Sequence, residues 1–121
     1  MTIFPSFLVK RVYKKGSLRK TDEGIAFDLK NFLGHATITG FNSITVNESL
    51  YKSEVIKIIT LGKSIIAETI TPDNPLLFKL NQEGTLLLEG ADNLKNGLNK
   101  IIVSLISQDA GIVSVTLTET I

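Results

Sequence analysis

Apolar and polar side chains alternate along most of the chain. In residues 24–31, Ile25, Phe27 and Leu29 point one way while Asp28 and Lys30 point the other, and residues 112–119 repeat the pattern with valine and leucine between serine and threonine. A period of two is typical of antiparallel strands with one face toward a core and one toward water. Both segments are therefore predicted to be strands with one buried face.

Two segments depart from this alternation. Residues 54–62 and 99–107 are apolar on both faces and rich in β-branched residues, which favours central strands covered on both sides. Shorter apolar runs predict further strands at 64–70, 76–80 and 85–90.

Turn residues separate these segments. Hairpin or linking turns are predicted at 21–24, 61–63, 81–84 and 108–111, and Pro72 and Pro75 fix a loop between them. Residues 33–47 are predicted as strand, turn and strand, with Gly40 permitting a bend or bulge. Residues 92–97 could form one helical turn and no more.

These elements predict an all-β fold. About nine short strands at regular spacing, with no long helix, indicate an antiparallel β-sandwich of immunoglobulin-like or jelly-roll-like type. The 121 residues are the usual size of one core, so we expect a single β-sandwich domain spanning 1–121. The composition, 43% hydrophobic and 21% charged, is ordinary for a globular protein.

Charge and cysteine usage narrow the functional classes. The net charge is +1, which provides no global field to attract nucleic acid or a membrane surface. The chain has no cysteine, which excludes disulfides and thiol chemistry and fits the cytoplasm. The first residues do not form a secretory signal, because the apolar part precedes the positive charges. We expect a cytoplasmic protein with no membrane segment.

His35 is the only histidine and the weak catalytic candidate. It could act as a general base with Asp28 or Glu68 in a cleft between oligomer subunits. The alternative, which we favour, is a half-exposed strand residue with a local hydrogen bond, because the pattern offers it no partner. One histidine and no cysteine predict no metal site, and no G-x-S-x-G turn or dinucleotide glycine motif predicts a nucleophile or a cofactor.

Basic residues are concentrated near the N-terminus. Such a cluster could follow a phosphate backbone, or it could protect a sheet edge or dock a partner. Because acidic residues follow closely and the chain is nearly neutral, we favour the second interpretation and do not expect nucleic acid. The cluster comprises Lys10, Arg11, Lys14, Lys15, Arg19 and Lys20, with Tyr13 among them.

Apolar residues beyond the needs of one core indicate a partner. Phe4 and Phe7 precede the first clear hairpin, and several strands are apolar on both faces. The partner is expected to be a second copy or a larger enzyme subunit. The candidate partner-binding residues are Phe4, Phe7, Lys10, Arg11 and Tyr13.

The order of the segments resembles the small β subunits of C-glycoside deglycosidases and related short archaeal proteins. The shared stretches are residues 16–19, 24–31, 36–41 and 44–47, followed by the spacing of Leu94, Gly97, Asn99, Ile101 and Val103. The chain departs from that pattern with Asn47-Glu48 where an Asp-Gly turn is usual and with Asn99 at a histidine position. The resemblance implies an accessory β-sandwich on a larger catalytic subunit, and it transfers no catalytic residue.

Some short archaeal proteins that resemble this chain carry the label hydroxymethylglutaryl-CoA reductase. Hydride transfer needs a nicotinamide site, and no glycine fingerprint for one is present. We therefore predict a non-catalytic accessory subunit that self-associates or docks on a larger enzyme. The alternatives are a small enzyme with a site around His35, and a binding module for a sugar or another small ligand.

Overall fold

A computed structural model describes residues 10–121 of the chain. These residues form two antiparallel sheets, which confirms the predicted all-β fold and the absence of a long helix within them. Two single-turn 3-10 helices lie within this range, η1 (Ser53–Val55) and η2 (Ala67–Thr69). Phe4 and Phe7 lie outside the described residues.

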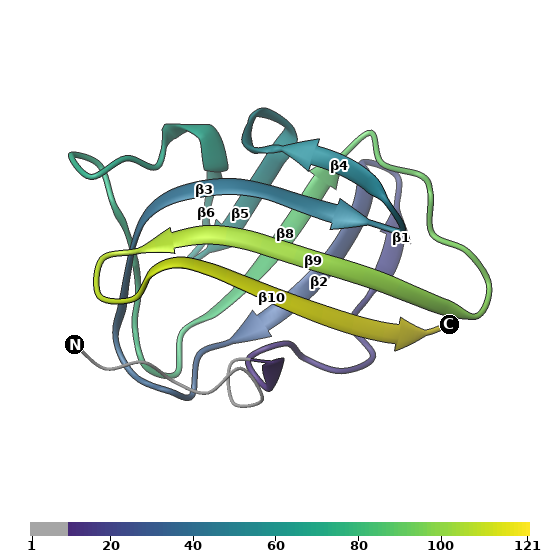
Figure 1. Cartoon of the computed structure of the whole chain (residues 1–121), viewed down its shortest axis with the longest axis horizontal. Coiled ribbons are helices and arrows are strands. Elements are labelled where there is room, and N and C mark those ends of the chain that lie inside the picture. The colour runs from purple at the N-terminus through teal and green to yellow at the C-terminus, as the bar shows by residue number, and fades with distance from the viewer. Residues whose placement is uncertain (1–9) are drawn as a thin grey trace.

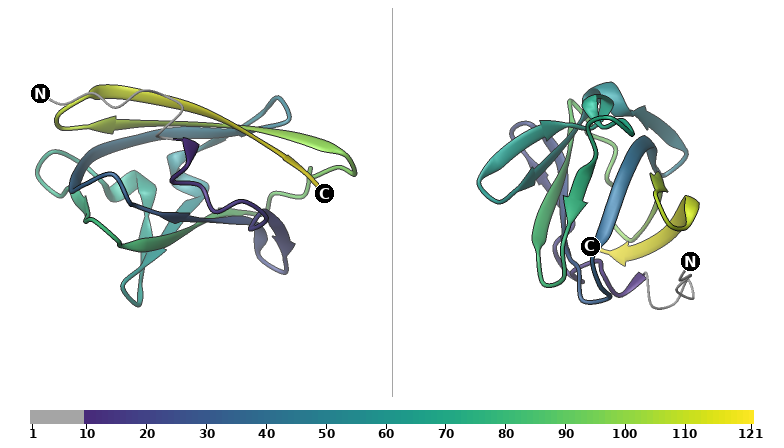
Figure 2. Two further views of the ribbon diagram at one scale, coloured as in Figure 1. Left: turned by 90° about the horizontal axis from the view of Figure 1, so that it is seen from below. Right: turned by 90° about the vertical axis from the view of Figure 1, so that its left-hand side faces the viewer.

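The two sheets pack as two layers (Figures 1 and 2). Sheet A has the strand order β1 (Arg19–Thr21), β2 (Gly24–Lys30), β8 (Glu83–Glu89), β5 (Ile56–Thr60) and β6 (Lys63–Ile66). Sheet B has the order β10 (Gly111–Thr120), β9 (Leu98–Ser107), β3 (Ala36–Val46) and β4 (Ser49–Lys52), and β7 (Leu76–Phe78) also pairs with β3.

Several predicted hairpins and central strands are confirmed. β1 and β2, β5 and β6, and β9 and β10 pair as antiparallel neighbours around the expected turns. At the β5–β6 turn, Leu61 and Gly62 both have positive φ (52° and 73°), the backbone of a type I′ hairpin turn. β5 and β9 lie between two other strands, as their two-sided apolar pattern indicated.

The prediction of a strand, turn and strand over residues 33–47 is wrong. Residues 36–46 form one strand of 11 residues, β3, and the irregularity is absorbed as register shifts against β9 at Ile38/Gly40 and Phe41/Ser43. A bulge inserts a residue into one strand without ending the ladder. Gly40 fits this position because a Cβ there would lie 3.1 Å from the Ile106 Cδ1 atom.

Other local predictions also need correction. The turn at 81–84 closes no hairpin, because β7 belongs to sheet B and β8 to sheet A. Residues 64–70 were predicted to be one strand, but only residues 64–66 belong to β6, and η2 spans Ala67–Thr69. Residues 92–97 form no helical turn, because the amide and carbonyl of Lys95 hydrogen-bond instead to the side chain of Asn99. Strand β4 was not predicted.

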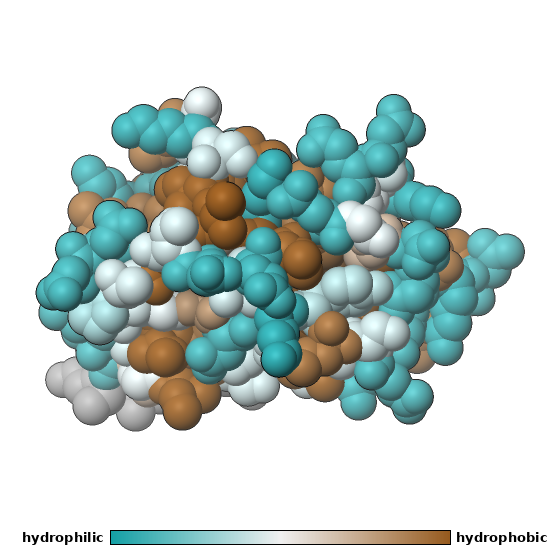
Figure 3. Space-filling view, turned by 90° about the horizontal axis from the view of Figure 1, so that it is seen from above, coloured by the Kyte–Doolittle hydropathy of each residue, from teal (hydrophilic) through white to brown (hydrophobic). Residues whose placement is uncertain are grey.

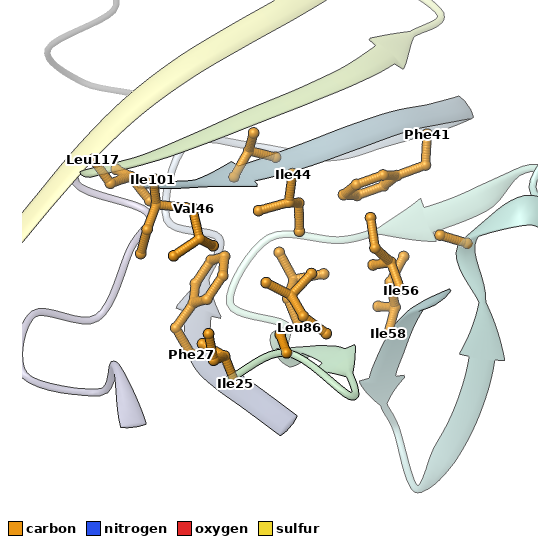
Figure 4. Close-up of a cluster of buried hydrophobic side chains, with 14 of the residues drawn as sticks. Ile25, Phe27, Phe41, Ile44, Val46, Ile56, Ile58, Leu86, Ile101 and Leu117 are labelled. Carbon is orange, nitrogen blue, oxygen red and sulfur yellow. The ribbon is translucent and has the colours of Figure 1, made fainter. Parts of the chain in front are cut away.

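The core lies between the two sheets (Figure 4). Ile44 and Ile101 of sheet B point toward Ile25, Phe27 and Leu86 of sheet A, and all five are at most 2% exposed. Ile25 and Phe27 thus face inward, as the alternation predicted. Burial of such side chains stabilises by about 1.5–3 kcal/mol each, so the sheet-to-sheet contact is the main source of stability.

Candidate functional site

The inner face of the β9–β10 hairpin is only partly covered by sheet A. Ile101 and Leu117 on this face are buried, whereas Leu105 and Val113, closer to the hairpin turn, are half-buried. β9 and β10 have ten residues each, and the longest strands of sheet A have seven. Three extra residues add about 10 Å at 3.3 Å per residue, so the hairpin extends beyond the opposite layer.

This overhang creates a groove with a volume of about 400 Å³. Its floor includes Leu105, Val113 and Val115 of the hairpin, and its opposite wall includes Val12 and Leu29. Segments from the beginning, the middle and the end of the chain therefore meet there, and the lining is mostly apolar.

The polar side chains that line the groove include those of His35, Asn31 and Asp109. The Asn31 side chain is buried and fully engaged: Nδ2 donates to the carbonyls of Gly34 (2.6 Å) and Phe78 (2.8 Å), and Oδ1 accepts from the amide of Leu33 (3.1 Å). Asn31 thus links the 31–34 loop to β7 and holds in place the loop that precedes His35.

The imidazole of His35 has a defined orientation. Its Nδ1 atom accepts a 3.2 Å hydrogen bond from the backbone amide of Leu80. A nitrogen that accepts is unprotonated, so the neutral ring carries its proton on Nε2. This bond is not local, because Leu80 is 45 residues away, and His35 is exposed and precedes β3, so the predicted half-exposed strand residue with a local hydrogen bond is wrong.

Neither predicted acid pairs with His35. Asp28 Oδ1 accepts from Thr85 Oγ1 (2.8 Å) and from Arg19 (3.2 Å), and Glu68 lies in η2. No hydrogen bond or ion pair among residues 10–121 joins His35 to either carboxylate. The three residues therefore do not form an acid–base constellation in this chain.

Tyr13 forms part of the groove wall and is held from two sides. Its hydroxyl donates a 2.7 Å hydrogen bond to Glu119, and its ring meets the Phe27 ring edge-on at 6.0 Å between centroids. Burial, followed by the hydrogen bond to the Glu119 carboxylate, raises the pKa of Tyr13 to about 12. The hydrogen bonds from Tyr13 and from the Gly16 amide (2.5 Å) lower the pKa of Glu119.

The structure disperses the rest of the basic cluster. Lys10 is exposed, and the Arg11 guanidinium lies 5.9 Å from the centre of the Phe32 ring, a cation–π distance. Lys14 pairs with Glu83 at 3.0 Å. These residues do not form one continuous basic surface, and of the partner-binding candidates among residues 10–121 only Tyr13 lines the groove.

Sequence reasoning missed the groove because no local pattern encodes it. The available signal was the length of the last two apolar runs, which exceeds that of the runs opposite them. A second hollow of about 400 Å³ lies beside β6 and the η2–β7 loop, and its lining includes Ile65, Ile70 and Pro75. It contains no ionisable residue, so the groove with His35 is the stronger candidate site.

No cluster of three or more histidine, cysteine or acidic residues among residues 10–121 is placed to hold a metal ion. No helix in the same range is long and apolar enough to cross a bilayer.

Comparison with known proteins assigns the family. A family model described as "Hydroxymethylglutaryl-CoA reductase, N-terminal domain" matches residues 8–121. No curated protein matches the chain. The match agrees with the label carried by short archaeal proteins of similar pattern, whereas the resemblance to deglycosidase subunits stays a prediction. Because the match spans all but the first seven residues, the chain belongs to the family of hydroxymethylglutaryl-CoA reductase N-terminal domains.

Proposed function

We propose that this chain is a non-catalytic docking domain whose groove binds an apolar segment of a larger catalytic unit. The family description names an N-terminal domain of hydroxymethylglutaryl-CoA reductase. Such a name implies that a separate part of the enzyme carries out catalysis. The partner is therefore proposed to be the catalytic unit of a reductase of this kind.

The partly uncovered inner face of the β9–β10 hairpin is the observation that carries the proposal. Leu105, Val113 and Val115 point inward yet are only half-buried. Covering apolar surface stabilises a complex by about 25 cal/mol per Å² removed from water, and concave apolar surfaces of this kind serve as protein contacts. On the face seen from above in Figure 1, apolar and polar residues are intermixed instead (Figure 3).

Catalysis by this chain alone receives no such support. The Nδ1 atom of His35 is engaged by the Leu80 amide, and Asp28 is bonded to Arg19 and Thr85. With Nδ1 already accepting and the proton on Nε2, the neutral ring has no free lone pair with which to act as a general base.

The test is binding of the purified chain to the purified catalytic reductase encoded in the same genome. Val113→Asp places a charge in the groove, and the matched control Thr118→Asp places the same charge on the exposed outer face of the same strand. We expect saturable binding by the unmodified chain and by Thr118→Asp, and at least about tenfold weaker binding by Val113→Asp. Equal binding by the two variants, or none by the unmodified chain, contradicts the proposal.

A small apolar ligand is the second candidate occupant. The groove volume of about 400 Å³ lies within the roughly 300–1,000 Å³ of small-molecule sites, and His35 places one polar group at its end. Calorimetric titration with acyl and isoprenoid compounds distinguishes this case, because Val113→Asp would then abolish heat of binding to the small molecule in the absence of any protein partner.

A further inference from the structure

Strand β10 forms a long outer edge of sheet B. It has ten residues and pairs only with β9 within residues 10–121. It is the lowest strand of the front layer in Figure 1, and Figure 2 shows it at the margin of its layer. Its outer backbone groups are therefore the longest row in the described fold without a strand partner.

The register identifies which backbone groups point outward. Gly97 and Ile121 exchange two hydrogen bonds, of 3.0 and 3.1 Å, at the end of the β9–β10 ladder. Because hydrogen-bonded and non-hydrogen-bonded pairs alternate in an antiparallel ladder, every second residue of β10 counted back from Ile121 bonds to β9. The residues between them direct their N–H and C=O groups outward: Ile112, Ser114, Thr116, Thr118 and Thr120.

The other outer strands are short and protected against pairing. β1, β4, β6 and β7 have three or four residues each, and short strands, lysine, arginine and proline all discourage edge-to-edge association. These strands carry or adjoin such residues: Arg19 and Lys20 in β1, Lys52 in β4, Lys63 in β6, and Pro75 and Lys79 beside β7.

β10 has none of these protections. It contains no lysine, arginine or proline, and its ladder with β9 has no bulge. Its one ionisable residue, Glu119, is buried and bonded to Tyr13 and Gly16. Within residues 10–121, the edge of β10 is therefore open to another strand in a way that the other edges are not.

We propose that two copies of this chain pair through their β10 edges, antiparallel, about a two-fold axis at Thr116. The outward-bonding residues are symmetric about Thr116, so this register alone lets all five bond to the partner. Ser114 of one copy then lies opposite Thr118 of the other, and no like charges meet. This self-association goes beyond the groove, because it uses the backbone edge of β10.

A second copy suits this edge better than an unrelated strand. An antiparallel two-fold contact uses the same patch twice, so the assembly closes and leaves neither β10 edge exposed. On the inner face, the half-buried Val115 of each copy lies opposite Leu117 of the other, so the apolar row continues across the contact.

Cysteine cross-linking tests the register, because the chain has no native cysteine. In the proposed pair the two Thr116 Cα atoms lie about 5.5 Å apart, within disulfide range. The two Thr118 positions are displaced by four residues, about 13 Å. We expect oxidised Thr116→Cys to form a covalent dimer and the matched control Thr118→Cys to stay uncross-linked.

Charge variants and light scattering of the full chain complete the test. The unmodified chain is expected to have a dimer mass, Thr116→Lys to dissociate at least about tenfold more readily, and an equimolar mixture of Thr116→Lys and Thr116→Glu to recover the dimer. Ser49→Lys, on the exposed strand β4 away from the β10 edge, controls for added charge and is expected to keep the dimer mass, and circular dichroism checks folding. A monomer mass at all concentrations overturns the proposal, as does a dimer in which Thr116→Cys and Thr118→Cys cross-link equally. If the chain is a monomer and still binds the reductase, the dimer proposal fails and the docking proposal stands.

Discussion

The Tyr13 hydroxyl donates a 2.7 Å hydrogen bond to the Glu119 carboxylate, which joins two residues 106 positions apart. Glu119 lies near the end of β10, and Tyr13 stands in the wall of the groove. The same carboxylate oxygen also accepts from the Gly16 amide at 2.5 Å. This one buried carboxylate thus anchors the N-terminal part of the described chain to the last strand.

Removing the Tyr13 hydroxyl should destabilise the protein. A hydrogen bond to a charged group contributes about 1.5–3 kcal/mol, so Tyr13→Phe is expected to lower the free energy of unfolding by about 2 kcal/mol in urea denaturation. Tyr51→Phe is the matched control, because its hydroxyl donates to the neutral Asn93 amide oxygen and a neutral bond contributes about 1 kcal/mol. A smaller loss for Tyr13→Phe than for Tyr51→Phe would show that the charge of Glu119 adds nothing.

The lowered pKa of Glu119 predicts a specific loss of stability in acid. A carboxyl whose folded-state pKa lies below its unfolded value binds protons more readily when unfolded. Its contribution is complete above the ordinary value of 4.5 and disappears as the pH falls through the lowered folded-state pKa. We expect Glu119→Gln to lose less stability than the unmodified chain between neutral pH and about pH 3, measured as the free energy of unfolding. Parallel curves for the two proteins would contradict the assignment.

The raised pKa of Tyr13 predicts a loss of stability in strong base. The chain has two tyrosines, so Tyr51→Phe leaves Tyr13 as the only phenol. Its ionisation, followed by ultraviolet absorbance, is expected near pH 12 rather than near the ordinary value of 10. Because the folded state holds the proton more tightly, this stabilisation is complete below pH 10 and is lost as the pH rises through 12. Titration near pH 10 in the folded protein would mean that the hydroxyl is not held by Glu119.

The fold was largely predictable because apolar side chains recur at every second position in several strands. Ile25 and Phe27 could be placed in the core from spacing alone, and both are fully buried. The predictions failed where the hydrogen bonds of a single side chain determine the backbone conformation. Asn99, a buried residue that bonds the Lys95 amide and carbonyl, prevents the helical turn expected at 92–97. Asn31 similarly fixes β7 to the 31–34 loop, so that β7 joins the other sheet.

The candidate site was less predictable than the fold. His35 was predicted to be a half-exposed strand residue with a local hydrogen bond, but it is exposed, precedes β3 and accepts from the amide of Leu80, 45 residues away. The groove combines segments around Val12, Leu29 and Val113, and alternation fixes which face each residue takes without fixing how far one sheet extends beyond the other.

Gly24 and Gly111 provide a matched pair for testing backbone requirements. A Cβ at Gly24, which has φ +150°, would lie 1.9 Å from the Leu88 carbonyl oxygen. Gly111 has φ +72° and no atom within 4 Å of such a Cβ. We expect Gly111→Ala to cost about 1 kcal/mol of stability and Gly24→Ala to cost more than about 3 kcal/mol, since β2 and β8 must separate. Comparable unfolding midpoints would refute the close approach of the two strands.

The β3–β4 turn offers a stabilising substitution. Asn47 and Glu48 both have positive φ, 47° and 78°, the backbone that an Asp-Gly or Asn-Gly pair adopts without strain. Asn47 is suited to its position, because its Nδ2 donates to Asn99 Oδ1 at 2.7 Å and its Oδ1 accepts from the Lys100 amide at 2.9 Å. Glu48 is exposed, and a side chain in this region costs about 1–2 kcal/mol.

Glu48→Gly should therefore raise the free energy of unfolding by about 0.5–1 kcal/mol in urea denaturation, since relief of the strain exceeds the added flexibility of the unfolded chain. Glu48→Ala, which removes the same charge and keeps the Cβ, is expected to give no gain. If alanine stabilised the protein as much as glycine, the benefit would come from loss of the carboxylate, and the strain at residue 48 would be negligible.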